Sequence, residues 1–504
     1  MRTLEELLRD LSDPAQISIE NLNVIRAACA DLVHSNRLEF SNHLQHSDLS
    51  KLFTILANLA SDEVPAYCDV LKTLLDCLPP QQLLAKYEIF IGQVLREGSN
   101  DHIQRLALQQ LHRCAQDSKV SSILIANPAL MGPVVDRFAS PTLNGQVRCL
   151  VLELTANSKD AVKLLFEGEI LKHLQQVQEK GSVEKLRVFE LYCQVACQSE
   201  ENCAKMTARL ESVVESMLTQ RSDVLVLLNY VELLTVLGTK AYTMNFLFTS
   251  DAISILKDLL NAPEDPNATF YMPGVLLFFG ELGSNNPVAL IEDNKSIVSV
   301  IFTMATLGSL FAPTAMAAVA QICRTREGKR CLEQHFSREM DIYMRSLGEC
   351  LETSKYSAEH KMSALNCVAA ILEMDEFDQL DVINLTEKWF NLLSSGPLQM
   401  LWRCAKVPFE TERLAVLRTL RHVALLPWGR EGLLKLPGFY EWLLDRSTEP
   451  NKVGKEGKHA IAAALLEVAN SIKDPAHVIG LRKFYAEGPF YSPSEVAVAT
   501  ESGA

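Results

Sequence analysis

The residue types that bind metals come closest together between His43 and Asp48. His43 and His46 are three residues apart, and Asp48 follows two positions later. Two imidazoles and a carboxylate could bind zinc, although no matching second cluster in the chain completes such a site. These residues therefore favour a polar helix end, and we predict neither a metal nor any other cofactor.

Cysteine is the second residue type with chemical potential. The thirteen cysteines are an odd number, are scattered along the chain and form no CxxC pair. This pattern indicates neither a disulfide framework nor a zinc framework and favours a reducing compartment. The closest pair, Cys193 and Cys197, lies one helical turn apart. We interpret both as small apolar groups that face a core.

Motifs for catalysis are missing from the chain. It contains no GxxxxGKS/T phosphate loop, no HExxH and no GxSxG, and each absence counts against an enzyme. The densest basic segment runs from Arg324 to Arg330, with four basic residues among seven. It could be a localisation signal or a contact for an acidic partner. We favour a loop between helices, in which Arg324 and Arg326 cap the preceding helix.

The charge balance of the 504 residues restricts the possible partners. There are 48 basic and 62 acidic residues, for a net charge of −14. This charge opposes binding to nucleic acid or to anionic membrane and favours a basic protein surface as partner. Apolar stretches are interrupted by Asn229, Glu232 and Glu281 before they reach membrane-spanning length. We predict a protein without a secretory signal, located in the cytoplasm and also compatible with the nucleus.

A helical repeat organises the chain. Each copy has a polar turn, a helix with apolar residues at about four, five and eight positions after an apolar anchor, and a second helix. The mean spacing of the anchors is about 44 residues, as in armadillo and HEAT repeats. The ten anchors are Val64, Ile103, Val147, Val183, Val224, Tyr271, Ala315, Met362, Leu414 and Ala460. We therefore predict an all-α, armadillo/HEAT-like α-solenoid of about ten repeats.

Glycines indicate where two helices meet, and composition indicates where the domains of the chain begin and end. Gly168 precedes an apolar-periodic segment, as does the glycine in LPGFYEWLLDRS from Leu436, and a glycine relieves the crowding where two helices meet sharply. We predict a helical cap over residues 1–60, the solenoid over 61–490 and a flexible acidic tail over 491–504.

A solenoid offers a long concave surface, which makes binding the expected function. In armadillo-like stacks the last helix of each unit lines the groove. Residues six and ten positions after the anchor then point inward. This rule selects eight candidate partner-binding residues: Gln109, Arg113, Glu153, Asn157, Phe189, Tyr230, Glu281 and Gln321.

Four longer segments carry a resemblance to a known family. They are FYMPGVLLFFGEL from Phe270, EKWFNLLSSGPLQML from Glu387, LPGFYEWLLDRS from Leu436 and FYAEGPFY from Phe484. With them the chain resembles the non-ATPase proteins that chaperone assembly of the 26S proteasome regulatory particle. The resemblance implies a binding cycle without chemistry, in which the groove holds the C-terminal domain of an ATPase subunit.

The partners implied by this resemblance are regulatory ATPase subunits 7 and 4 together with non-ATPase subunit 2. The chaperone would leave before the particle is complete, because its affinity for the intermediate differs from its affinity for the finished ring. We further expect a monomer when no partner is bound, and no small-molecule substrate. The family has no short contact motif, so the resemblance adds no residue to the groove candidates.

Two alternatives remain. An importin-like or general adaptor would read basic peptides with a ladder of Trp and Asn along its inner helices. The chain has only four tryptophans, at positions 389, 402, 428 and 442, and Asn157 is an isolated match. An unrecognised enzyme would require titratable groups that converge in one pocket, and no part of the sequence locates one.

Overall fold

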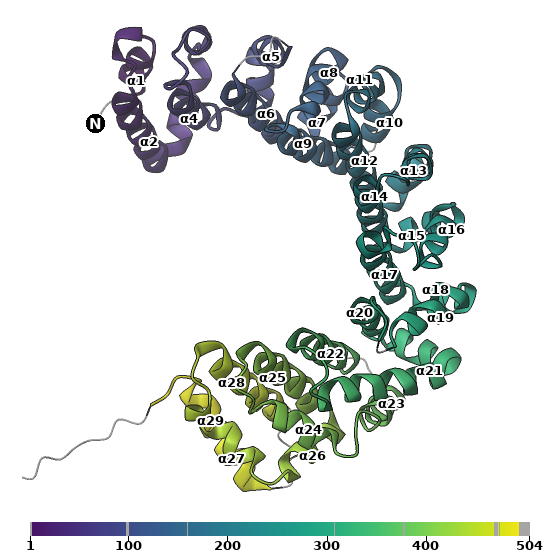
Figure 1. Cartoon of the computed structure of the whole chain (residues 1–504). Coiled ribbons are helices and arrows are strands. Elements are labelled where there is room, and N and C mark those ends of the chain that lie inside the picture. The colour runs from purple at the N-terminus through teal and green to yellow at the C-terminus, as the bar shows by residue number, and fades with distance from the viewer. Residues whose placement is uncertain are drawn as a thin grey trace, which may run out of the picture. The chain divides into compact units, whose positions relative to one another are not determined.

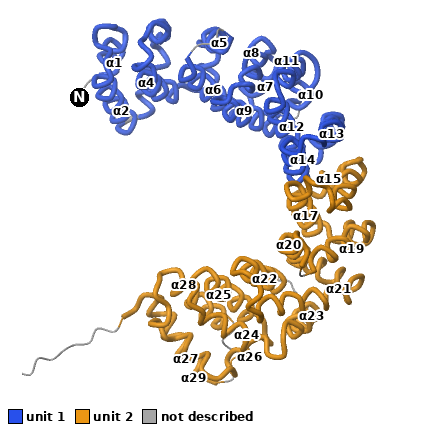
Figure 2. The backbone as a smooth tube through the Cα atoms, in the orientation of Figure 1, with its two compact units in different colours: residues 1–237 blue, residues 238–504 orange. Residues whose placement is uncertain are grey.

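The computed structural model describes residues 3–96, 100–158, 160–306, 308–375, 379–467, 472 and 474–492. All regular secondary structure in these residues is helical (Figure 1), which confirms the predicted all-α class. The chain forms two compact units, residues 1–237 and residues 238–504 (Figure 2). The predicted tail lies, from residue 493 onward, outside the described residues. The boundary predicted at residue 60 stays a prediction.

Unit 1 consists of two rows of helices. One row packs in the order α2 (Ile19–His46), α4 (Val64–Leu75), α6 (Asp101–Ala115), α9 (Asn144–Asn157), α12 (Ser182–Ala196) and α14 (Val224–Leu237) (Figure 1). We call these the ladder helices of unit 1. The other row contains α1 (Leu4–Leu11), α3 (Ser50–Leu56), α5 (Pro80–Arg96), α7 (Ser118–Ile125), α8 (Pro128–Asp136), α10 (Ala161–Phe166), α11 (Gly168–Glu179) and α13 (Glu200–Gln220).

Unit 2 repeats the arrangement. Its ladder helices are α17 (Ala268–Asn285), α20 (Ala312–Ile322), α22 (Ala358–Ile371), α25 (Glu410–Leu425) and α28 (Lys452–Leu466), each packed on the next. The other helices are α15 (Ala241–Thr249), α16 (Ala252–Leu260), α18 (Pro287–Asp293), α19 (Lys295–Met304), α21 (Arg326–Glu352), α23 (Leu380–Phe390), α24 (Pro397–Cys404), α26 (Pro427–Lys435), α27 (Phe439–Leu444) and α29 (Pro475–Glu487). Both units are therefore α-solenoid stacks.

All ten sequence anchors lie in ladder helices, from α4 to α28. Their burial shows where the predicted register holds. Val147 and Tyr271 are 0% and 1% exposed, whereas Val183 and Met362 are 54% and 36% exposed. The periodic pattern therefore found the right helices, but its anchors on α12 and α22 are exposed residues instead of core residues.

The two glycine corners are confirmed. Gly168 has φ 70° where α10 gives way to α11, and Gly438 has φ 80° directly before α27. Both values lie in the left-handed region, which side chains with a Cβ rarely enter. Each glycine therefore permits a sharp turn of the backbone at the start of the helix that follows.

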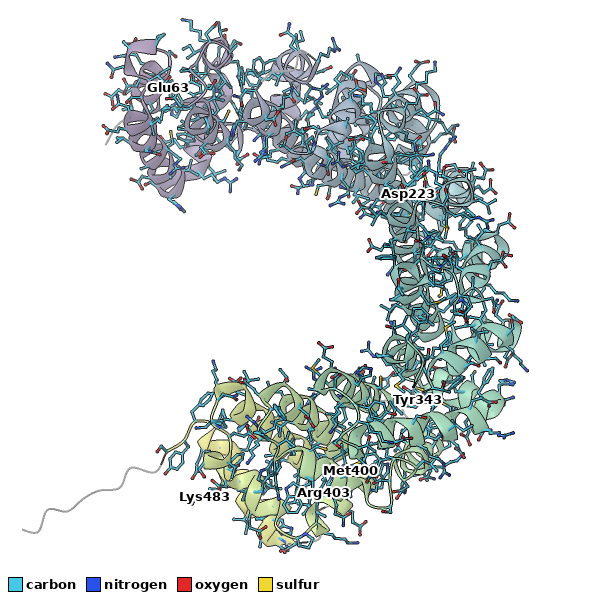
Figure 3. All side chains as sticks on the ribbon, in the orientation of Figure 1. Glu63, Asp223, Tyr343, Met400, Arg403 and Lys483 are labelled. Atoms are coloured by element: carbon cyan, nitrogen blue, oxygen red, sulfur yellow. The ribbon has the colours of Figure 1, made fainter. Side chains whose placement is uncertain are left out.

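Buried tyrosines join the two rows of each unit. In unit 1 the Tyr67 hydroxyl on α4 donates to the Leu11 carbonyl at the end of α1 (3.0 Å). In unit 2 the Tyr343 hydroxyl on α21, labelled in Figure 3, donates to the Met316 carbonyl on α20 (2.8 Å). A buried hydroxyl needs such a partner because burial without one is unfavourable. Within the described residues, no helix is long and apolar enough to cross a bilayer.

Candidate functional site

The histidine segment forms the end of a helix. His46 is the last residue of α2, and its Nδ1 lies 2.8 Å from the Asn42 carbonyl oxygen, while His43 lies 4.0 Å from Glu39. The Asp48 carboxylate accepts from the Ser50 amide (2.9 Å), and hydrogen bonds from Ser50 lower the pKa of Asp48. Across the described residues, no group of three or more potential ligands is arranged to hold a metal.

The predicted cysteine pair lies against the core of unit 1. Cys193 is 0% exposed, and burial raises the pKa of its thiol well above the ordinary value. The Cys197 thiol lies 3.4 Å from the Val236 carbonyl oxygen of α14. A thiol with a raised pKa is poorly nucleophilic, so Cys193 is a packing residue.

Most basic side chains of the segment from Arg324 to Arg330 bind groups within unit 2. Arg324 makes a two-point ion pair with Glu373 (2.9 and 3.1 Å). Lys329 is fully buried, and its ammonium donates to the carbonyls of Glu373 (2.8 Å) and Arg324 (3.4 Å). Lys329 therefore caps the carbonyls at the helix ends. The sequence pattern assigned this role to Arg324 and Arg326.

The other two arginines of the segment also have partners. Arg326 pairs with its neighbour Glu327 (3.1 Å), and Arg330 pairs with Asp381 (2.8 Å). Internal ion pairs thus engage the positive charges that a localisation receptor or an acidic partner would have to bind.

The candidate interaction surface is the ladder face, which we define as the solvent-facing side of the ladder helices in each unit. Near the end of these helices a polar side chain reaches across to the preceding one. Arg113 on α6 donates to the carbonyls of Leu75 and Leu78 at the end of α4 (both 2.7 Å). Arg113 therefore holds two repeats together, and its guanidinium is only partly available to a partner.

Glu153 and Asn157 follow the same scheme on α9. Asn157 donates to the Ala115 carbonyl at the end of α6 (3.0 Å) and to the Glu153 carboxylate (2.8 Å). Glu153 also lies 3.9 Å from His112 of α6. Gln109 is half-buried on the same helix as His112. These three candidates remain on the ladder face of unit 1.

Phe189 and Tyr230 lie elsewhere. They are 2% and 0% exposed, and their rings lie 6.1 Å apart between α12 and α14. The Tyr230 hydroxyl donates to Gln220 of α13 (3.0 Å). Both aromatic residues thus belong to the core, in contrast to the inward-facing positions assigned to them from the sequence.

Glu281 and Gln321 are brought together in unit 2. The Gln321 amide on α20 donates to the Glu281 carboxylate on α17. The two helices approach closely because residue 280 is a glycine: a Cβ at this position would lie 2.9 Å from the Cα of Ala318. Pairing between neighbouring ladder helices is thus common to both units.

The register of α12 explains what the sequence rule missed. Helix α9 buries Val147, Leu150, Val151, Leu154 and Thr155, and α12 buries Val188, Leu191, Tyr192, Val195 and Ala196 with the same spacing. Counting from Val188 selects Gln194 and Gln198. Gln198 donates to the Leu152 carbonyl of α9 (2.8 Å), just as Asn157 donates to α6.

The ladder face of unit 1 is hollowed between α12 and α14. This α12–α14 depression has a volume of about 380 Å³. Its lining residues are Val183, Leu186, Arg187, Glu190, Asn229, Glu232, Leu233 and Val236. Apolar side chains therefore lie beside charged ones, as in the contact regions of protein interfaces.

The charged residues of the α12–α14 depression differ in how many hydrogen bonds and ion pairs they form within the protein. Glu190 accepts from Arg148 (2.5 Å) and Gln194 (2.9 Å). Arg187 donates to the Ala139 carbonyl (3.2 Å). Glu232 is exposed on α14. The rim thus offers Glu232 to a partner more freely than Glu190.

Unit 2 has a second hollow, the α20–α25 depression, with a volume of about 390 Å³. It is lined by Ala317, Ala320, Gln321, Arg324, Ser363, Asn366, Cys367, Ala369, Ala370, Glu373, Arg418 and His422. The ion pair with Arg324 lowers the pKa of Glu373. Burial lowers the pKa of His422, Glu373 raises it, and the nearby arginines 421, 418 and 324 lower it.

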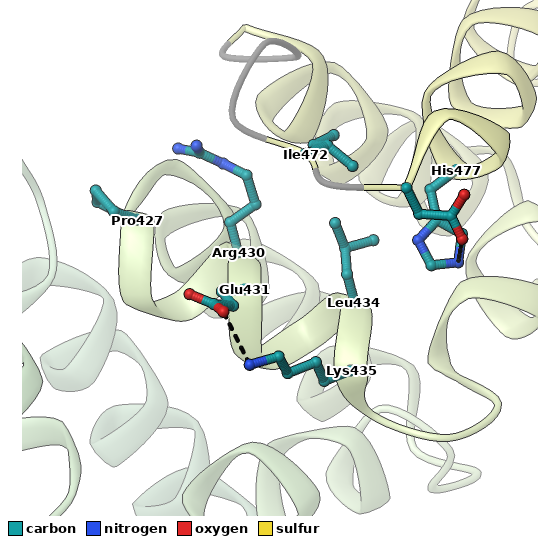
Figure 4. A pocket seen from close by; sticks show the side chains of 8 residues that line it. Pro427, Arg430, Glu431, Leu434, Lys435, Ile472 and His477 are labelled. Carbon is teal, nitrogen blue, oxygen red and sulfur yellow. Dashed lines mark hydrogen bonds and ion pairs between the residues drawn. The ribbon is translucent and has the colours of Figure 1, made fainter.

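A third hollow of about 270 Å³ lies beside α26 and the start of α29 (Figure 4). Pro427, Leu434 and His477 are among the residues that line it. The charged residues Glu431 and Lys435 form an ion pair with each other (2.8 Å). This hollow lies apart from the ladder helices.

Removing the Arg113 side chain should destabilise unit 1. We expect Arg113→Met to lower the free energy of unfolding by about 1 to 3 kcal/mol, because two carbonyls lose a charged donor. Urea unfolding followed by circular dichroism measures the change. Lys119→Met on the exposed side of α7 is the control and should stay within about 0.5 kcal/mol of the original protein. Equal stability of the two variants would contradict the capping role.

Comparison with known proteins adds the family. A family model described as "Proteasome non-ATPase 26S subunit" matches residues 2–504. The 26S proteasome non-ATPase regulatory subunit 5 of Bos taurus is 24% identical over 497 residues, which cover 96% of each chain. The Homo sapiens protein of that name is 25% identical over 466 residues, which cover 90% of each chain. Yeast importin-beta (Kap95p) has a similar fold, with a TM-score of 0.53 and 15% identity over 95% of this chain and 59% of its own.

Proposed function

Because the chain belongs to the proteasome non-ATPase 26S subunit family, we propose that it is an assembly chaperone for the base of the 26S proteasome regulatory particle. In this proposal the ladder face binds the C-terminal domains of regulatory ATPase subunits 7 and 4, in an intermediate that also contains non-ATPase subunit 2. The protein acts by binding alone, in the cytoplasm and the nucleus, and leaves before the particle is complete.

The observation that carries the proposal is the family match over residues 2–504, on a solenoid whose ladder face is hollowed and polar. In the α12–α14 depression, Leu186 and Val236 are half-buried beside the exposed Asn229 and Glu232. An apolar floor with a polar rim suits a folded protein domain as partner. Gln109, Glu153 and Asn157 extend this surface along unit 1.

Release requires that the ladder face binds the intermediate more tightly than the finished ring. In this proposal, neighbouring subunits compete with the protein for the same patch of the ATPase subunit during assembly. This competition supplies the difference in affinity. Charged rim residues mainly affect the rate of encounter and the choice of partner. Glu232 is the rim residue that can act in this way without first breaking a pair between ladder helices.

The test is an affinity pull-down of the tagged protein from cell extract, followed by native separation of assembly intermediates from complete proteasomes. We expect the base ATPases with the protein in small intermediates and no protein in finished particles. The double variant Asn229→Ala with Glu232→Arg should recover about tenfold less ATPase, because it changes two exposed side chains that line the depression.

Glu211→Arg is the matched control, since it makes the same charge change at an exposed position of α13 in the same unit. It should recover as much ATPase as the original protein. Stoichiometric presence in finished proteasomes would overturn the chaperone mechanism. Recovery of transport cargo without proteasome subunits would favour the importin-like adaptor instead.

A further inference from the structure

The α20–α25 depression contains more positive charge than its carboxylate balances. Glu373 is already bound at two points by Arg324. Arg418 lines the depression from α25, and Arg421 lies one turn further along the same helix. Both are exposed, and neither has an ion pair or hydrogen bond within the described part of the chain. The guanidinium of Arg418 inside the depression and that of Arg421 on the same helix are thus available to a ligand.

The arginines act on the same small region. His422 directly follows Arg421 and lines the depression. Burial lowers its pKa, Glu373 raises it, and the positive charges of Arg421, Arg418 and Arg324 lower it. Like charges that act on one imidazole also repel one another, and the repulsion is stronger beside a protein surface than in bulk water. A negatively charged ligand would relieve this repulsion.

The floor and walls indicate what kind of anion fits. The floor includes Ala317, Ala320 and Ala369, whose short side chains leave the volume of about 390 Å³ open. Ser363 and Asn366 add groups that can donate and accept hydrogen bonds, as a peptide backbone requires. A guanidinium binds a carboxylate through two parallel hydrogen bonds, with a geometry that a single ammonium does not offer.

The net charge of −14 argues against a long polyanion. Nucleic acid would be repelled by the rest of the chain, and the two free arginines would release too few counterions to compensate. A short acidic segment places its negative charge only beside the arginines. The charge complementarity between the depression and its ligand therefore favours a peptide.

We propose that the α20–α25 depression binds an acidic peptide segment of a protein partner, with Arg418 and Arg421 holding its side-chain carboxylates. The inference deepens the proposed function and rests on it, because it treats the ladder face as the partner surface. It assigns to unit 2 a partner chemistry opposite to the one that the overall charge suggests.

The experiment uses the full-length protein and a fluorescein-labelled peptide of alternating glutamate and serine, with binding followed by fluorescence anisotropy. Arg418→Glu with Arg421→Glu should weaken binding at least tenfold. A peptide with glutamine in place of glutamate should not bind. Arg338→Glu on α21 is the control, because Arg338 is an exposed arginine of the same unit outside the depression, and this variant should bind normally.

Thermal unfolding shows whether the double variant is folded, and Arg418→Gln with Arg421→Gln, which should also weaken binding, is the milder alternative. Absence of binding by the original protein would overturn the proposal, as would equal binding by either double variant or by the glutamine peptide. Tighter binding of a thymidine oligonucleotide of equal charge would overturn the choice of a peptide. The pull-down is independent of the anisotropy measurement. ATPase recovery without peptide binding would overturn only this inference. Peptide binding without ATPase recovery would overturn only the proposed function.

Discussion

Lys458→Met is expected to destabilise unit 2 by about 3 to 5 kcal/mol, since removal of one member of a buried charged network leaves the others unpaired. Lys458 is fully buried on α28, and its ammonium donates to the carbonyls of Trp442 and Asp445 and to the Thr448 hydroxyl. It also lies 4.1 Å from the centre of the Trp442 ring. Methionine keeps most of the volume but offers no donor.

Glu449 makes this substitution more costly. It is 1% exposed, its carboxylate lies 3.5 Å from Arg413, and its negative charge also acts on Lys458. All four tryptophans lie in unit 2, so urea unfolding followed by tryptophan fluorescence reports on the correct unit. Lys455→Met, one turn earlier on α28, is the control. A loss below 1 kcal/mol at Lys458 would show that water enters the network.

The same residue gives a pH dependence with a defined sign. Burial lowers the pKa of Lys458 from 10.5 to about 8. Between these values the unfolded chain holds the proton that the folded chain has released, so the contribution of Lys458 to stability rises with pH. The rise is on the order of 3 kcal/mol over that window. Buried tyrosines and cysteines with raised pKa act in the opposite direction, but Lys458→Met keeps all of them. The difference in stability between the two proteins should therefore widen from pH 8 to pH 10.

The helical pattern predicted the architecture because every ladder helix must bury one side against its neighbours. The anchors at Val64, Val147 and Tyr271 are buried as expected, and Gly438 has the positive φ that a corner requires. The α12 register could not be predicted, because Val183 is apolar and exposed. A single apolar residue on the solvent side therefore displaced the inferred core face of this helix.

The candidate site was less predictable for a different reason. Arg187 belongs to α12 and Glu232 to α14, and only the packing of these helices places them around one depression. Asn157 was found because its position repeats along the ladder helices. Arg418 follows no such repeat. A hollow formed by three helices becomes visible only when their separation is known.

Phe189→Ala should lower the free energy of unfolding by about 3 to 5 kcal/mol, as for other buried aromatic residues. The Phe189 ring lies 6.0 Å from the ring of Tyr192 and 6.1 Å from that of Tyr230, with the Lys185 ammonium 5.6 Å from its centre. Urea unfolding followed by circular dichroism measures the loss. Hydrogen exchange with mass spectrometry locates it, and we expect the amides of α12 and α14 to lose protection first.

Val183→Ala is the decisive comparison on the same helix. The sequence register places Val183 in the core and Phe189 in the groove, whereas the structure leaves Val183 54% exposed and Phe189 2% exposed. The two methyl groups of an exposed valine contribute little to the free energy of unfolding. Val183→Ala should therefore change this free energy by less than about 0.5 kcal/mol. A larger loss from Val183→Ala than from Phe189→Ala would restore the sequence register. It would also remove Arg187 and Glu190 from the ladder face, since the orientation of α12 determines which residues line the depression.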